Sequence, residues 1–326
     1  MSLRVAVQMD PLEHINIGGD SSFALMLAAQ ARGHAVWHYD VATLAYETDG
    51  TPQGRITAHA APVTVQRVAG AHFSAGERRR IDLARDIDVV LMRQDPPFHL
   101  GYISAAFLLD RLKGTTLVLN DPREVVNAPE KMFVLDYARF MPPTLVARSL
   151  ADIRDFQQRH GAVVVKPLHG NGGKAIFRID ADGTNLSALS EVFNQTWPEP
   201  HMVQPFLPEV AEGDKRIVLV DGEFAGAINR FPGEGEFRSN LAQGGHAEAT
   251  HLTAQEEEIC AAMGPELRRR GLVFVGIDVI GGRWLTEINV TSPTGIVAID
   301  RFNGTDTPSR IWDAIERRHA NLAASR

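Results

Sequence analysis

The sequence predicts an α/β protein in which a mostly parallel sheet comes first and an α+β region follows. Residues 1–120 alternate strand and helix patterns, which is typical of βαβ units and a parallel sheet. Beyond residue 121, pairs of strands are joined by short glycine turns, which is typical of antiparallel hairpins. With 326 residues, the chain is long enough for two or three domains with ample core.

Local patterns define the elements of the first part. Residues 3–9 alternate apolar and polar side chains up to an Asp-Pro pair, so they predict a strand. Asp20 is suited to the N-cap of a helix that ends at Gly33. The other predicted elements are two buried strands with a helix between them, at residues 88–92, 115–120 and 104–112.

The second part begins near residue 121 with a helix that Ser149 caps and Gly161 ends. A hairpin of residues 163–168 and 174–179 then encloses the glycine-rich turn HGNGG. A strand at 201–206 and a hairpin of 216–220 with 223–229 follow. A helix from Thr253 to Arg270, which starts with a capping box, comes next. The last element is a hairpin of 273–280 with 283–290. Residues 231–246 predict a long mobile loop that acts as a lid.

Composition excludes several classes of protein. The net charge of −7 argues against a nucleic-acid surface, and no apolar run has the length of a membrane span. A single cysteine, Cys260, rules out an intrachain disulfide and fits a small buried apolar residue in a helix. We therefore expect a cytoplasmic protein that binds neither nucleic acid nor membrane.

Three oxygen-bearing side chains converge in the last predicted hairpin. Glu287 and Asn289 share one face of a strand because they are two residues apart, and Asp278 on the preceding strand can reach the same region. Hard oxygen ligands of this kind suit Mg²⁺, which proteins hold with one or two carboxylates plus substrate phosphates. The alternative is a polar strand edge that faces solvent.

Several basic and glycine residues predict a phosphate site. Lys166 ends a buried strand beside the glycine turn, and Lys131 lies in NAPEKMF. Glycine turns expose backbone N–H groups to phosphates, although a plain hairpin turn explains this one almost equally well. Arginine forks suit phosphate and carboxylate oxygens, and the candidates are Arg216, Arg230 and Arg238. Lysines that reach solvent and ordinary surface charge are the alternatives.

The order of these features resembles the ATP-grasp ligases and, within them, the bacterial glutathione synthetases. Four stretches bear the resemblance, at residues 9–34, 89–98, 163–178 and 271–295, and it extends to about residue 318. It implies a substrate domain at 1–120, the two-subdomain ATP-grasp fold with a lid subdomain at 121–200 and a metal-binding subdomain at 201–318, and a tail at 319–326.

The resemblance implies the ATP-dependent joining of γ-glutamylcysteine to glycine through an acyl phosphate, with Mg²⁺ or Mn²⁺, in a homotetramer. It implies nucleotide contacts by Lys131, Lys166, Gly170, Asn171, Gly172, Gly173, Gln204, Phe206, Leu207, Asp214 and Arg216. It places the metal on Asp278, Glu287 and Asn289, assigns catalytic roles to Arg230, Arg238 and Lys166, and assigns substrate contacts to Asp20, Ser21, Ser22, Asn240 and Ser292.

A few positions depart from the family pattern. Val297 follows SPTGI where an arginine is expected, Pro205 removes a backbone N–H from the hinge, Lys174 adds a cation after the glycines, and Gln94 stands where a lysine is common. Two rival functions stay open. One is an ATP-grasp ligase with a different dipeptide or amino-acid substrate, and the other is a nucleotide-binding module without ligase activity.

Overall fold

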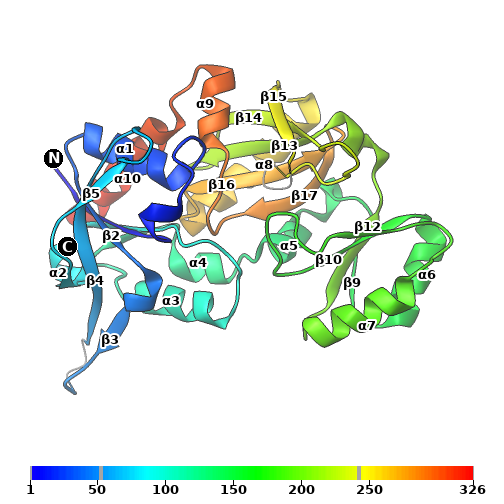
Figure 1. Cartoon of the computed structure of the whole chain (residues 1–326), viewed down its shortest axis with the longest axis horizontal. Coiled ribbons are helices and arrows are strands. Elements are labelled where there is room, and N and C mark those ends of the chain that lie inside the picture. Colours follow the sequence, from blue (N-terminus) through cyan, green and yellow to red (C-terminus); the bar gives the residue numbers. More distant parts are fainter. Residues whose placement is uncertain (1, 51–53, 241–243, 326) are drawn as a thin grey trace.

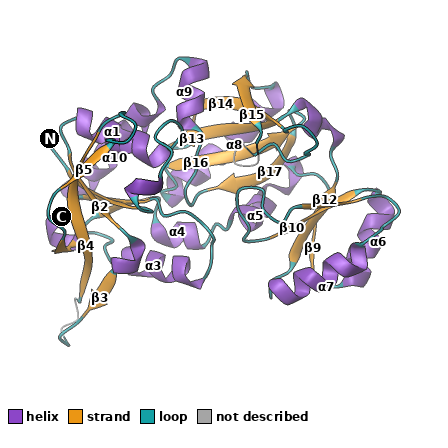
Figure 2. Ribbon diagram, viewed as in Figure 1, coloured by secondary structure: helices purple, strands orange, loops and turns teal. Residues whose placement is uncertain are grey.

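The computed structural model describes residues 2–50, 54–240 and 244–325, and it forms three sheets along the chain (Figures 1 and 2). The first sheet has a parallel centre in the order β2-β1-β7-β8, which are Ala35–Tyr39, Arg4–Gln8, Val89–Met92 and Leu117–Leu119. An antiparallel extension continues from β2 through β4 (Arg55–Val65), which also pairs with β3 (Ala45–Glu47), β5 (Phe73–Ala75) and β6 (Arg79–Asp82).

The helices of this part are α1 (Ser21–Ala31), α2 (Leu83–Asp86), α3 (Leu100–Asp110) and α4 (Pro122–Val126). Asp20 caps α1 as predicted, because its carboxylate accepts a hydrogen bond from the Phe23 N–H at 2.6 Å. Helix α3 begins at residue 100 rather than 104. Its cap is His99, whose ring accepts from the Tyr102 N–H, and histidine is an uncommon cap that the sequence pattern did not indicate.

The second sheet is a separate four-stranded layer in the order β11-β10-β12-β9. Its strands are Phe177–Ile179, Val163–Pro167, His201–Pro205 and Leu145–Ala147, and all of their pairings are antiparallel. Helices α6 (Leu150–His160) and α7 (Leu186–Thr196) pack on it, and their apolar side chains form a small core with the strands. This sheet lies at the right of Figure 1, beyond the short helix α5 (Glu130–Phe133).

The third sheet has the order β15-β14-β13-β16-β17 and is antiparallel throughout. Its strands are His246–Ala249, Glu223–Phe231, Asp214–Val220, Phe274–Ile280 and Trp284–Asn289. Helix α8 (Ala254–Arg270) starts with the predicted capping box, and α9 (Ile296–Asn303) and α10 (Thr307–Ala324) follow the sheet. No helix in the described part of the chain has the length and apolar character of a membrane span.

The side chain of Asn120 links the first and third sheets by hydrogen bonds. The Asn120 amide donates to the carbonyls of Phe274 and Val290 and accepts from the N–H groups of Val273 and Phe274, all within 2.9 Å. Because β16 and β17 carry the predicted metal ligands, this junction fixes those two strands relative to the N-terminal domain.

The predicted fold class is confirmed, with differences at several boundaries. Strand β11 begins at 177 instead of 174, and Ala175 has a positive φ of 55°, which an extended strand does not allow. Residues 319–324, predicted as a tail, continue α10, which packs on α1 through residues such as Trp312, whose indole donates to the Leu25 carbonyl. The domain bounds stay a prediction. Within the predicted loop 231–246, residues 241–243 lie outside the described residues, and its mobility stays a prediction.

Candidate active site

The predicted metal ligands share one face of the last hairpin. Asp278 lies directly opposite Glu287 in the β16–β17 register, and Gly276 lies opposite Asn289. Side chains of cross-strand partners, and of residues two apart, point to the same face, so the two carboxylates and the amide are neighbours as the sequence predicts.

Two arginines balance the charge of Asp278. The Arg216 guanidinium donates to both oxygens of Asp278, at 2.6 and 3.1 Å, and Arg230 lies 3.1 Å from Asp278. Arg230 also pairs with Asp214 at 2.6 Å. Burial opposes the charge of Asp278, but the two guanidiniums outweigh it and hold the pKa of that carboxyl well below its usual range.

This network assigns new partners to three residues that the sequence predicts as ligand contacts. Arg216 pairs with Asp278, Arg230 pairs with Asp214, and both arginines are nearly fully buried. Asp214, predicted near the ribose, also accepts from the Ser239 hydroxyl at 3.0 Å. Burial raises the pKa of Asp214, which shares Arg230 with Asp278. Their contacts to a nucleotide or a substrate stay predictions.

The two predicted lysines differ in their partners. Lys131 is 3% exposed, pairs with Glu287 at 3.1 Å and donates to the Gly170 carbonyl at 2.7 Å. Burial disfavours its charge, but Glu287 and Glu130 outweigh this effect and raise the pKa of Lys131.

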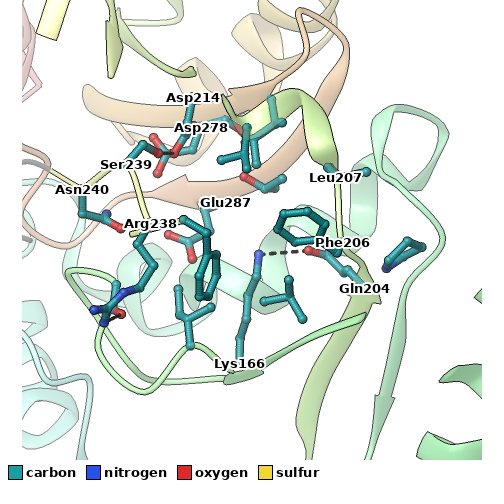
Figure 3. Close-up of a pocket in the computed structure, with 18 residues that line it drawn as sticks. Lys166, Gln204, Phe206, Leu207, Asp214, Arg238, Ser239, Asn240, Asp278 and Glu287 are labelled. Atoms are coloured by element: carbon teal, nitrogen blue, oxygen red, sulfur yellow. Dashed lines mark hydrogen bonds between the residues drawn. The ribbon is translucent and has the colours of Figure 1, made fainter. Parts of the chain in front are cut away.

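Lys166 is buried as well, but the described part of the chain gives it no ion-pair partner; its ammonium donates to the Gln204 side chain at 3.0 Å (Figure 3). Burial lowers the pKa of Lys166. A buried ammonium without a carboxylate partner is costly for a folded protein, so this position favours an anionic ligand.

A cavity between the second and third sheets surrounds Lys166. In Figure 3 the Lys166 ammonium, Glu287 and the aromatic ring of Phe206 face one another across it. The Arg178 guanidinium stacks on Phe206 at 4.1 Å. The wall includes the predicted Gly173, Gln204, Phe206, Leu207, Asp214 and Arg238, together with Phe237, Ser239 and Asn240, of which the sequence predicted only Asn240.

The loop after β14 closes over the glycine turn. Arg238 donates to the Gly173 carbonyl at 2.9 Å. A Cβ atom at Gly173 would lie 2.4 Å from the Asn240 amide oxygen, and Gly173 has a φ of +75°. Any other residue here would have to displace the Asn240 side chain and would hold its backbone at a strained positive φ, so this position favours glycine.

A second cavity adjoins the first and brings all three sheets together. Its wall includes Asn16, Asp20, Asp95, Glu130, Asn171, Gly172, Arg216, Arg230, Asn240, Glu287, Asn289, Ser292, Val297 and Arg301. Asn240 and Glu287 line both cavities. A nucleotide in the first cavity would therefore meet a molecule in the second at the predicted metal site.

The predicted N-terminal contacts divide into two groups. Asp20 lines the second cavity while it also caps α1. Ser21 and Ser22 are buried, and neither is among the described residues that line the two cavities. The Ser22 hydroxyl instead accepts from Arg93, whose other arm donates to the Pro293 carbonyl, so Ser22 positions the loop after β17.

Sequence reasoning missed Glu130. Its carboxylate accepts from the Thr291 hydroxyl at 2.8 Å, and burial raises its pKa to about 7, against the pull of Lys131. The acidic residue next to Lys131, a predicted phosphate contact, was the available signal.

The donor set fits a hard divalent cation. Asp278, Glu287 and Asn289 supply oxygen atoms, and phosphate oxygens would complete the shell. The amide nitrogen of Asn289 is buried and has no hydrogen-bond partner in the described part of the chain. An amide can be turned to present its oxygen instead. Three His, Cys, Asp or Glu side chains do not converge on one metal position among the described residues, so a metal here depends on the asparagine and on phosphates.

Comparisons with known proteins agree with this architecture. The family model "Prokaryotic glutathione synthetase, N-terminal domain" matches residues 3–125, and "Prokaryotic glutathione synthetase, ATP-grasp domain" matches residues 130–304. A glutathione synthetase of Rhodopseudomonas palustris is 53% identical over 320 residues, which cover 98% of this chain and 100% of that protein. One from Synechocystis is 42% identical over 324 residues, covering 97% of this chain and 99% of that protein.

Solved structures show the same fold at low identity. D-cycloserine synthetase DcsG matches with a TM-score of 0.68 at 18% identity, covering 97% of this chain and 99% of that one. The ATP-grasp ligase PsnB, complexed with Mg, ADP and a precursor variant, matches with a TM-score of 0.60 at 16% identity, covering 97% and 98%. The full-length relatives and the two matched domains together show that this chain belongs to the prokaryotic glutathione synthetase family of ATP-grasp ligases.

Proposed function

We propose that this protein joins γ-glutamylcysteine to glycine and converts ATP to ADP and phosphate. The observation that supports this most strongly is the pair of adjoining cavities that share Glu287 and Asn240. One cavity has an aromatic wall and a buried lysine that has no ion-pair partner among the described residues, and these features suit a nucleotide. The other has acidic and basic patches, which suit a zwitterionic peptide.

The first step is the transfer of the ATP γ-phosphoryl group to the cysteinyl carboxylate. A carboxylate oxygen forms the new P–O bond while the bond to the ADP oxygen breaks. Lys166 neutralises phosphate oxygens as an ammonium that has no competing ion pair among the described residues. Lys131 approaches the same region from α5 and is held there by Glu287 and the Gly170 carbonyl. Such preorganised charges cost no reorganisation during the reaction.

A divalent cation would be held by Asp278, Glu287 and Asn289, and it would supply charge neutralisation on the phosphates. We propose Mg²⁺, with Mn²⁺ as a substitute. The arginines that pair with Asp278 fix the orientation of this carboxylate before any nucleotide arrives. Arg216 and Arg230 thus position a metal ligand, in addition to the phosphate and substrate contacts predicted for them.

The second step is the attack of the glycine amine on the acyl carbon, which expels phosphate. The acyl phosphate must be kept from water until the amine arrives. The contact between Arg238 and the Gly173 carbonyl brings the loop after β14 over the glycine turn. We propose that this contact closes the site during the reaction, and that Asn240 and Ser292 contact the substrate from the cavity wall. We also propose that the enzyme acts as a cytoplasmic homotetramer.

The test is an ADP-release assay with a panel of γ-glutamyl dipeptides, other dipeptides and amine acceptors, with the product identified by mass spectrometry. The proposal predicts ADP and glutathione only when γ-glutamylcysteine and glycine are both present. ADP release with a different carboxylate, and none with γ-glutamylcysteine, would indicate an ATP-grasp ligase of another specificity. Nucleotide binding without turnover for every pair would indicate a binding module.

A further inference from the structure

The second cavity has an uneven charge distribution. Asp20, Asp95, Glu130 and Glu287 place acidic side chains on the walls formed by the N-terminal domain, α5 and β17. These walls suit an ammonium group and repel a carboxylate. Both proposed substrates carry a carboxylate that does not react, so a cation elsewhere in the cavity must receive it.

Arg301 is the lining cation that is not already committed. Arg216 and Arg230 are held by buried aspartates. Arg301, in contrast, makes no hydrogen bond or ion pair within residues 2–50, 54–240 and 244–325, and its guanidinium only lies over the neighbouring Phe302 ring at 4.5 Å. It is exposed while it lines the cavity, so it is available to a ligand.

Helix α9 adds a second attraction for an anion at the same wall. It begins after Gly295, which has a φ of 106°, and no side chain in the described part of the chain caps its first N–H groups. Gly295, Val297 and Ala298 at this end line the cavity together with Arg301. Free N–H groups and the helix dipole favour negative charge at a helix N-terminus.

The geometry of a helix connects these two features. Arg301 lies four residues after Val297, so the two side chains share one face of α9. Helical side chains lean toward the N-terminus, and Arg301 can therefore reach over the small Val297 side chain toward the free N–H groups. A longer side chain at position 297 would occupy that path.

We propose that Arg301 and the N-terminal end of α9 form a specificity site for a non-reacting substrate carboxylate. This inference rests on the proposed function and names the subsite within it. The carboxylate is either the α-carboxylate of the γ-glutamyl group or that of glycine, since both present the same chemistry to a guanidinium.

The test compares Arg301→Gln, Arg301→Lys and a control, Arg159→Gln, which removes an exposed arginine on α6 that pairs with Asp155. Arg301→Gln raises the KM of one substrate by about 10- to 100-fold and changes kcat by less than about threefold, the scale of one charge-assisted hydrogen bond to a bound ligand. Lysine recovers part of the loss, and Arg159→Gln has no effect. Val297→Glu places an acid four residues before Arg301 and reproduces the loss, whereas Val297→Gln does so more weakly.

Substrate analogues identify the carboxylate. If the γ-glutamyl carboxylate binds here, Arg301→Gln weakens γ-glutamylcysteine but not 4-aminobutyryl-cysteine, which lacks that carboxylate. If the glycine carboxylate binds here, the variant raises the KM of glycine but not that of methylamine. Unchanged KM values for both substrates, or equal losses with and without each carboxylate, overturn the inference. The wild-type protein is assayed first, and its failure to form glutathione would instead count against the proposed function.

Discussion

Replacement of Glu287 by glutamine separates two roles of this carboxylate, one proposed and one seen in the structure. Glu287 belongs to the proposed metal site, and it also pairs with Lys131 at 3.1 Å. The change removes one acid from an acidic cluster, but it also leaves the Lys131 ammonium, 3% exposed, without its nearest countercharge.

The expected loss of stability follows from that burial. Removal of one partner of a fully buried ion pair costs about 3–5 kcal/mol, because the other charge stays uncompensated. Lys131 keeps its hydrogen bond to Gly170 and the nearby charge of Glu130, and the Glu287 side chain is 17% exposed. We therefore expect a loss of about 2–3 kcal/mol in the free energy of unfolding for Glu287→Gln, below the fully buried limit.

The matched variants are Lys131→Met and the double variant. In Lys131→Met/Glu287→Gln both charges of this ion pair are removed together, so most of the lost stability returns, to within about 1 kcal/mol of the wild type. Turnover does not return, since kcat falls by at least about 100-fold in all three variants. Urea unfolding followed by circular dichroism measures the first effect, and ADP release at saturating ATP and Mg²⁺ measures the second.

Two results would refute this reasoning. If Glu287→Gln has the same midpoint of urea unfolding as the wild type, Glu287 does not compensate the charge of Lys131. If the folded variant turns over at a near-normal rate, Glu287 does not belong to the metal site.

Three further changes test other parts of the site. Lys166→Met leaves the ligand-free protein as stable as the wild type or more stable, because it removes a buried charge that has no ion-pair partner in the described part of the chain. It also abolishes the rise in Tm on addition of ATP and Mg²⁺, and a retained rise counts against a phosphate role. Gly173→Ala lowers kcat/KM for ATP about 10-fold more than Gly172→Ala does. Both glycines have a positive φ, but only a Cβ atom at Gly173 would meet Asn240. Equal losses in the two variants would mean that backbone strain alone lowers kcat/KM. Burial raises the pKa of Glu130 from 4.5 to about 7, so between these pH values the folded state holds a proton that the unfolded state loses, and the contribution of Glu130 to stability declines as the pH rises. Glu130→Gln is therefore more stable than the wild type by about 1–3 kcal/mol at pH 8 but not at pH 4.5. A difference that does not depend on pH would contradict this.

The sequence predicts the hairpin that carries the proposed metal ligands, but not its exact register. Glu287 and Asn289 share a face because they are two residues apart on β17, and Gly281 and Gly282 lie in the turn with positive φ angles. A bulge between Asp278 and Val279 places Asp278 opposite Glu287, and no local sequence signal indicates that bulge. The N-terminal extension around β4 was missed, because Arg55–Val65 includes three alanines and a proline and lacks a clear alternation.

The arginine network was missed for a different reason. The turn at Asp221 and Gly222 predicts that Asp214 lies opposite residue 229, on a regular hairpin. A bulge between Val218 and Leu219 shifts the register by one residue and places Arg230 opposite Asp214 instead. A shift of one residue exchanges the two faces of a strand, so the sequence could not show whether Arg230 faces the site.

The central claim, that the enzyme activates a carboxylate by phosphorylation, is tested most directly by the fate of one oxygen atom. γ-Glutamylcysteine labelled with ¹⁸O in its cysteinyl carboxylate is incubated with ATP, Mg²⁺ and glycine, and the released phosphate is analysed by mass spectrometry. In the proposed mechanism a carboxylate oxygen bonds to phosphorus and leaves with it when the amine attacks. The phosphate then carries one ¹⁸O atom for each glutathione molecule formed from fully labelled substrate. Unlabelled phosphate accompanied by labelled glutathione would contradict the acyl-phosphate mechanism.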